Sequence, residues 1–155
     1  MIFKRLNRTD PESVFIVARN SEGATLNADA TCAWETASAS IDGVRVRQPD
    51  TSHLGSITGI VDAAIADGAY GLIQVYGYRS TSRVFQTNTS QDTGVFLEAS
   101  LAAQHLSSYA SSQTFDSNTT VSVTHRPGPF FILGESIASS AASATISAKV
   151  FVRCL

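Results

Sequence analysis

The stretch that decides the fold is LIQVYGY, residues 72–78, near the middle of the chain. Side chains of an extended backbone point to alternate sides, so Leu72, Gln74 and Tyr76 face one way and Ile73 and Val75 the other. β-Branched and aromatic residues dominate the stretch, and these residue types are enriched in strands. The stretch therefore predicts a β-strand with a mostly apolar surface on both sides.

Alternation with a period of two recurs on both sides of this stretch, and glycine, proline and asparagine residues separate the segments that show it. The further predicted strands cover residues 14–19, 44–47, 94–97, 120–125, 130–133 and 146–153. A length of 155 residues fits one domain. The sequence therefore predicts a mainly β protein with a single domain over residues 1–155, an antiparallel β-sandwich or barrel of the jelly-roll type.

Helical spacing is confined to two short segments. Ser56–Asp67 places Ile57, Ile60, Val61 and other apolar residues on one helical face, with Gly68 as a C-cap. Glu98–His105 is a second, weaker candidate. We expect one or two short helices. Residues 1–11 are polar and basic and end at a proline, which is compatible with an extended N-terminal arm or with a frayed terminus.

Charge is scarce in this chain. Charged residues make up 15% of it, against roughly 25% in an average soluble domain. The formal net charge is −2, which argues against nucleic acid as a partner because phosphate binding needs a clustered basic excess. No apolar run approaches the ~20 residues of a membrane span, and the N-terminal residues do not resemble a signal peptide. We expect neither a nucleic-acid nor a membrane partner.

The positive charge is mostly arginine: nine Arg stand beside two Lys. Protein interfaces are enriched in arginine and depleted in lysine, and a genomic bias towards arginine explains the ratio equally well. Together with the low total charge, the ratio favours a protein whose surface is covered by neighbours.

Cysteine and histidine give no sign of a metal or cofactor. Cys32 and Cys154 lie 122 positions apart without a CxxC pair, so we expect two buried small apolar residues, with a disulfide as the alternative. His53, His105 and His125 lack ligand spacing. No cofactor and no metal site are expected.

Asp92-Thr93-Gly94 is the sharpest enzymatic signal. In aspartic proteases this triplet holds a carboxylate at the tip of a turn, and a chain with one copy would act as a homodimer of the retroviral type. The competing interpretation is an ordinary turn between strands, since aspartate and glycine are turn residues. The polar residues before the triplet favour the turn. We expect no catalytic residue, and the homodimeric protease built on Asp92 is the alternative.

The segment DAAIADGAYGLIQVYG, residues 62–77, is the most distinctive in the chain. It resembles a segment of small structural proteins of tailed-bacteriophage particles, the decoration, cement or head-associated proteins. The resemblance implies a non-enzymatic virion protein on the capsid surface, assembled in the host cytoplasm. It also implies binding to the major capsid protein, often as a homotrimer. A glycan-binding fibre domain on the virion is a further alternative, suggested by the aromatic residues and the β content.

Candidate contact residues are the arginines and tyrosines around the predicted strands, together with one glutamine. The arginines are candidates to pair with capsid carboxylates, and the tyrosines to anchor an interface. Gln74 either is buried and needs amide partners or faces solvent on an edge strand. The protein-binding candidates are Arg5, Arg8, Arg45, Arg47, Tyr70, Gln74, Tyr76, Tyr78, Arg79 and Arg83, the last two around a turn predicted at Tyr78–Ser82.

Overall fold

The computed structural model describes residues 12–36, 42–50, 56–86, 93–94, 96–99, 104–108, 113–116, 119–121, 130–132 and 144–154. These residues form eleven β-strands and no α-helix, which confirms the mainly β class. Within the same residues there is no helix long and apolar enough to cross a membrane. The expected N-terminal arm, residues 1–11, lies outside the described part.

The first group of strands closes into a ring around one end of the longest strand. The hydrogen-bonded order is β1-β3-β2-β4-β5, and β1 pairs with β5 to complete the circle. The strands are β1 (Ser13–Asn20), β2 (Thr31–Trp34), β3 (Arg45–Arg47), β4 (Ile57–Val61) and β5 (Tyr70–Gln86). Only the first half of β5 belongs to this ring, since β1 pairs with residues 70–77.

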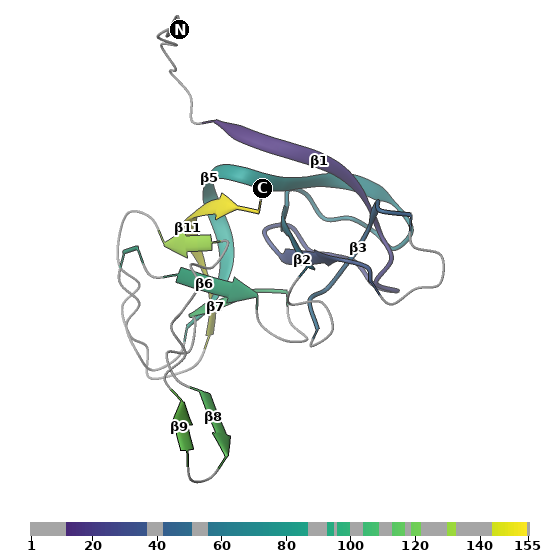
Figure 1. Ribbon diagram of the computed structural model, residues 1–155. Coiled ribbons are helices and arrows are strands. Elements are labelled where there is room, and N and C mark those ends of the chain that lie inside the picture. Colours follow the sequence, from purple (N-terminus) through teal and green to yellow (C-terminus); the bar gives the residue numbers. More distant parts are fainter. Residues whose placement is uncertain are drawn as a thin grey trace, which may run out of the picture.

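The second ring uses the other half of the same strand. Its order is β5-β11-β10-β6-β7, and it closes where β7 pairs with β5. The additional strands are β6 (Phe96–Ala99), β7 (Leu106–Ser108), β10 (Phe130–Ile132) and β11 (Ala144–Arg153). In Figure 1, β5 runs from the β1–β3 group towards β6, β7 and β11. A separate hairpin joins β8 (Gln113–Asp116) and β9 (Thr119–Val121).

Both rings contain one parallel pair, although the sequence predicted an antiparallel sheet. The parallel pairs are β1–β3 and β5–β7, and every other pairing in the two rings is antiparallel. A closed ring with five members cannot alternate in direction all the way round, so at least one of its pairings must be parallel. The parallel pairs are therefore a consequence of closing an odd number of strands.

Each ring encloses its own apolar core. The core of the first ring consists of Ala18, Leu26, Ala30, Cys32, Val46, Val61, Ile65, Ile73 and Val75. The core of the second consists of Ile60, Val84, Leu97, Leu106, Phe130, Ile132, Val150 and Val152. Side chains of five-stranded rings fill the interior without a channel, as expected for small barrels.

The predicted helix over Ser56–Asp67 is wrong. Ile57–Val61 form β4, which lies between β2 and β5 and is buried from Thr58 onward. β-Branched residues favour an extended backbone over a helix, and the paired strands on both sides satisfy the backbone of β4. Residues 62–69 form bends and turns, in which Ile65 exchanges two backbone hydrogen bonds with Leu26.

The second predicted helix also fails where the structure describes it. Glu98 and Ala99 belong to β6, and residues 104–105 form a bend; residues 100–103 are outside the described part. The turn predicted at Tyr78–Ser82 is wrong as well, because β5 continues through these residues to Gln86. Arg79 and Ser82 are buried, and the two exposed residues between them, Ser80 and Thr81, coincide with a shift in the register between β5 and β11.

The two cysteines lie where the cores meet. Cys32 belongs to the first core, and Cys154 packs against both. Both thiols are free, so the alternative of a disulfide is not observed; Cys32 is buried as expected, whereas Cys154 is half-buried. Burial raises the pKa of Cys154 to about 12, and burial together with the neighbouring Cys154 raises that of Cys32.

Gly77 occupies the point of β5 where the two rings join. It pairs with Ser13 of β1 on one edge and with Val152 of β11 on the other. Its φ of 105° is one that residues with a side chain rarely adopt, and a Cβ there would overlap the carbonyl oxygen of Glu12. Only glycine allows β1 and β11 to reach β5 at the same place.

We predict that Gly77→Ala lowers the free energy of unfolding by about 3 kcal/mol, from backbone strain and overpacking together. Gly23→Ala is the control, because Gly23 also has a positive φ but has open space around it. It should cost only about 1 kcal/mol. Urea unfolding measures both values, and equal losses for the two variants would contradict the role of Gly77.

We predict that neither native cysteine reacts at pH 8 with a thiol reagent such as 5,5′-dithiobis(2-nitrobenzoate) faster than the protein unfolds. The thiolate is the reactive form, and burial suppresses it. A cysteine introduced by Ser147→Cys, at an exposed position of β11, serves as the reactive control. Rapid labelling of Cys32 or Cys154 in the native protein would show that the junction between the cores is open.

Candidate functional site

Arg79 is the centre of a hydrogen-bond network that joins β5 to the turn before β2 and to the end of β4. Its side chain is 8% exposed although it carries a full charge. Nε and Nη2 donate to Oδ1 of Asp29 at 3.1 and 2.7 Å, and Nη1 donates to Oδ1 of Asp62 at 3.1 Å. The carbonyl oxygens of Thr81, Val61 and Asp62 accept further bonds. All the donor groups of this guanidinium are used within the chain.

Gln74 of β5 extends the network from Arg79 to the backbone of the same strand. It is buried, its Oε1 accepts from Nη1 of Arg79 at 3.2 Å, and its Nε2 donates to the carbonyl oxygens of Tyr76 and Tyr78. Of the two positions considered for Gln74, the buried one with satisfied partners is observed. Its partners belong to its own strand, so Gln74 and Arg79 hold β5 in shape and are not available to bind another chain.

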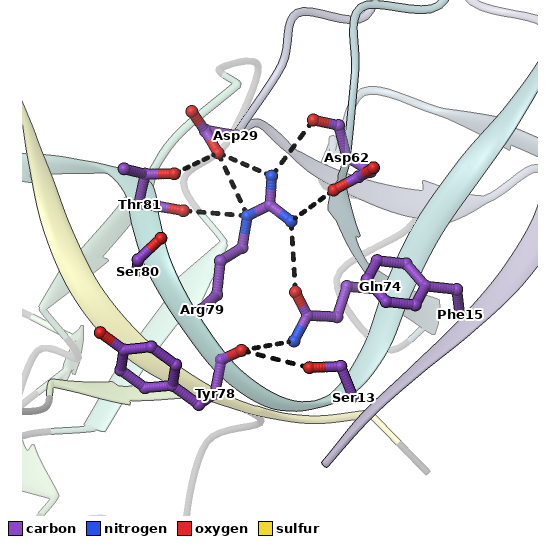
Figure 2. A pocket seen from close by; sticks show the side chains of 9 residues that line it. All are labelled: Ser13, Phe15, Asp29, Asp62, Gln74, Tyr78, Arg79, Ser80 and Thr81. Atoms are coloured by element: carbon purple, nitrogen blue, oxygen red, sulfur yellow. Dashed lines mark hydrogen bonds and ion pairs between the residues drawn. The ribbon is translucent and has the colours of Figure 1, made fainter. Parts of the chain in front are cut away.

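An open hollow of about 430 Å³ lies over this network. Figure 2 shows the residues that line it, with Phe15 of β1 on one side of the Gln74–Arg79 pair and Tyr78 and Ser80 of β5 on the other. The lining residues are Ser13, Phe15, Asp29, Asp62, Gln74, Tyr78, Arg79, Ser80 and Thr81, which we call the Arg79 hollow.

Next to the hollow, the outer side of β1 and β5 is apolar and exposed. Val17 lies directly opposite Leu72, and these side chains are 61% and 46% exposed. Phe15 lies two residues before Val17 on β1, and Tyr70 lies two residues before Leu72 on β5, so both point to the same side of the sheet. Phe15 is 40% exposed and Tyr70 is 65% exposed. We call Phe15, Val17, Tyr70 and Leu72 the β1–β5 face. Contiguous exposed apolar residues mark binding surfaces more often than single ones do.

The remaining predicted contact residues are spread over the molecule. Tyr70 is on the β1–β5 face, Tyr78 lines the hollow, and Tyr76 packs edge-on against Phe151 at 5.3 Å between ring centres. Arg83 is half-buried on the second half of β5. Of the predicted contact residues, the structure therefore brings together only Gln74, Tyr78 and Arg79 in the hollow and Tyr70 on the neighbouring face.

The two arginines of β3 lie on the opposite side of that strand from buried Val46, as its alternation predicts. Nε of Arg45 is 2.9 Å from Asp42, whose pKa is held below its usual value mainly by the backbone N–H of Val44 and also by Arg45. Arg47 lies among Glu22, Glu35 and Asp50, at 3.4, 3.3 and 3.9 Å. Both guanidiniums are already paired within the chain.

Three of the residues singled out in the sequence lie outside the described part of the chain: Arg5, Arg8 and Asp92. The two residues after Asp92, Thr93 and Gly94, form a turn, and the N–H of Gly94 donates to the carbonyl oxygen of Ile132 at 2.9 Å. Within the residues that the structure describes, no three His, Cys, Asp or Glu residues form a group able to hold a metal ion.

No family model, curated protein or solved structure matches the chain. The candidate site therefore stands on its geometry.

Sequence reasoning missed Phe15, Asp29 and Asp62. Asp29 precedes β2 and Asp62 follows β4, and both lie far from Arg79 in the sequence. The one available signal was an arginine directly after the apolar strand predicted over residues 72–78, which requires carboxylate partners if it is buried. The sequence does not say which of the 13 acidic residues supply them.

We predict that Arg79→Met lowers the free energy of unfolding by about 3 kcal/mol, because it leaves Oε1 of Gln74 and Asp62 without their donor and Asp29 without its charged partner. Arg83→Met is the matched control on the same strand and should cost less than about 1 kcal/mol. Urea unfolding of the two variants decides the matter. A loss for Arg79→Met no greater than that for Arg83→Met would contradict the structural role of the network.

Proposed function

We propose that this protein is a non-enzymatic structural component of a virus particle, which binds and stabilises the shell of major capsid protein through the β1–β5 face. The observation that carries the proposal is the exposure of four apolar side chains side by side on two paired strands. A weakly charged surface with such a face is suited to permanent contact with neighbours.

The segment that resembles phage decoration proteins contributes to this face. Residues 62–77 comprise the turn before β5 and the first half of β5, and they include Tyr70 and Leu72. Tyrosine is enriched among residues that dominate binding energy at interfaces. The distinctive part of the sequence thus coincides with half of the exposed face, and β1 provides the other half.

We propose that the protein also self-associates. A homotrimer would present three copies of the face, and simultaneous contacts raise the overall affinity without any new interaction. The partners proposed are therefore the major capsid protein and further copies of this chain, with the protein located on the capsid surface.

We predict that particles of the virus that encodes this protein contain it in near-stoichiometric ratio to the major capsid protein, as measured by quantitative mass spectrometry. Leu72→Glu should reduce incorporation at least about tenfold, because the interface would have to bury an unpaired charge. Leu72 is 46% exposed, so the substitution leaves the core intact.

The matched control is Thr145→Glu, an exposed position on β11 of the second ring. It should incorporate like the parent protein. Absence of the parent from purified particles would refute the proposed function, and full incorporation of Leu72→Glu would refute the role of the β1–β5 face.

A further inference from the structure

We propose that the Arg79 hollow accepts an arginine side chain from the protein that docks on the β1–β5 face. The inference deepens the proposed function and rests on it for the nature of the partner: an apolar surface with an arginine at one end. Phe15 belongs to both the face and the hollow, so a partner lying on the face reaches the hollow without a gap.

The Arg79 hollow carries an excess of negative charge. Asp29 and Asp62 bring two negative charges and Arg79 brings one positive charge, so one net negative charge remains in the network. The two carboxylates are partly accessible, with side-chain exposures of 30% and 43%, whereas Arg79 is buried beneath them. A ligand therefore meets the negative groups first.

The two aspartates of the hollow retain hydrogen-bond acceptors that the described residues do not use. The bonds from Arg79 and Thr81 all reach Oδ1 of Asp29, and the bond from Arg79 reaches Oδ1 of Asp62. None of the described residues donates to Oδ2 of either aspartate. The donors of Arg79 are consumed, so the hollow offers mainly acceptors and suits a ligand rich in donors.

The carboxylates of the hollow are held in position before a ligand binds. The two aspartates come from different elements, before β2 and after β4, and Arg79 fixes both carboxylates by their Oδ1 atoms. The planar fork of a guanidinium has donors in several directions and can reach two carboxylates at once. The exposed ring of Phe15 provides an apolar wall against which such a group can stack.

The test is a titration of ¹⁵N-labelled protein with Nα-acetyl-argininamide, followed by NMR. Shift changes should concentrate on the amides of Asp29, Asp62, Ser80 and Thr81 and should weaken as salt is added. The matching citrulline derivative has the same shape without the charge, and it should produce no comparable changes. Equal changes with citrulline, changes elsewhere, or none at all would overturn the inference.

Variants separate a specific site from general attraction to acidic residues. Asp62→Asn should weaken the binding of the arginine derivative at least about tenfold. The control is Asp67→Asn, an exposed aspartate in the neighbouring turn that accepts from the N–H of Gly23; its affinity should equal that of the parent. Phe15→Leu retains the charges and should weaken binding severalfold. Unchanged affinity in Asp62→Asn would overturn the inference, and so would calcium chloride producing the same shifts at lower concentration.

The result of the NMR titration can be distinguished from the result of the incorporation experiment that tests the proposed function. Localised shifts with the arginine derivative support the hollow even if Leu72→Glu is fully incorporated into particles. Conversely, incorporation that depends on Leu72 but is accompanied by no shifts would retain the face and overturn the hollow.

Discussion

The structure depends on one strand being used twice. β5 has 17 residues, and its first half closes one five-stranded ring while its second half closes another. Because β1 and β11 both reach the strand at Gly77, the two rings share a boundary instead of a linker. Cys154 packs against both cores at this boundary, and Cys32 belongs to the first. The rings therefore support each other through shared backbone as well as shared side chains.

The shared strand also fixes the surface that we consider functional. Leu72 of the face and Arg79 of the hollow lie on the same strand, and Gln74 between them bonds to Arg79 and to the carbonyl oxygens of its own strand. A surface held in this way loses little conformational freedom on binding, which favours affinity. The buried guanidinium is costly to desolvate, but its carboxylate and carbonyl partners compensate for that cost. The same network that stabilises β5 thus shapes the hollow.

Much of the fold was predictable from local pattern. The strands around residues 14–19, 44–47, 72–78, 130–133 and 146–153 were found because apolar and polar residues alternate there. β4 was mistaken for a helix because its apolar residues also fit a helical spacing. The segment is a strand because it pairs with β2 and β5, and such tertiary contacts are not visible in the local sequence. The second half of β5 was mistaken for a turn because its sequence is polar, and only the ion pairs of Arg79 explain how an arginine is buried there. Ring closure could not be predicted at all, since strand order depends on contacts far apart in the sequence.

The most direct test of the account is a reconstruction of the virus particle by electron cryo-microscopy at side-chain resolution. We predict that Val17 and Leu72 are covered by the capsid shell and that an arginine of the shell protein enters the hollow beside Asp29 and Asp62. A particle in which this chain is bound with the β1–β5 face open to solvent would contradict it.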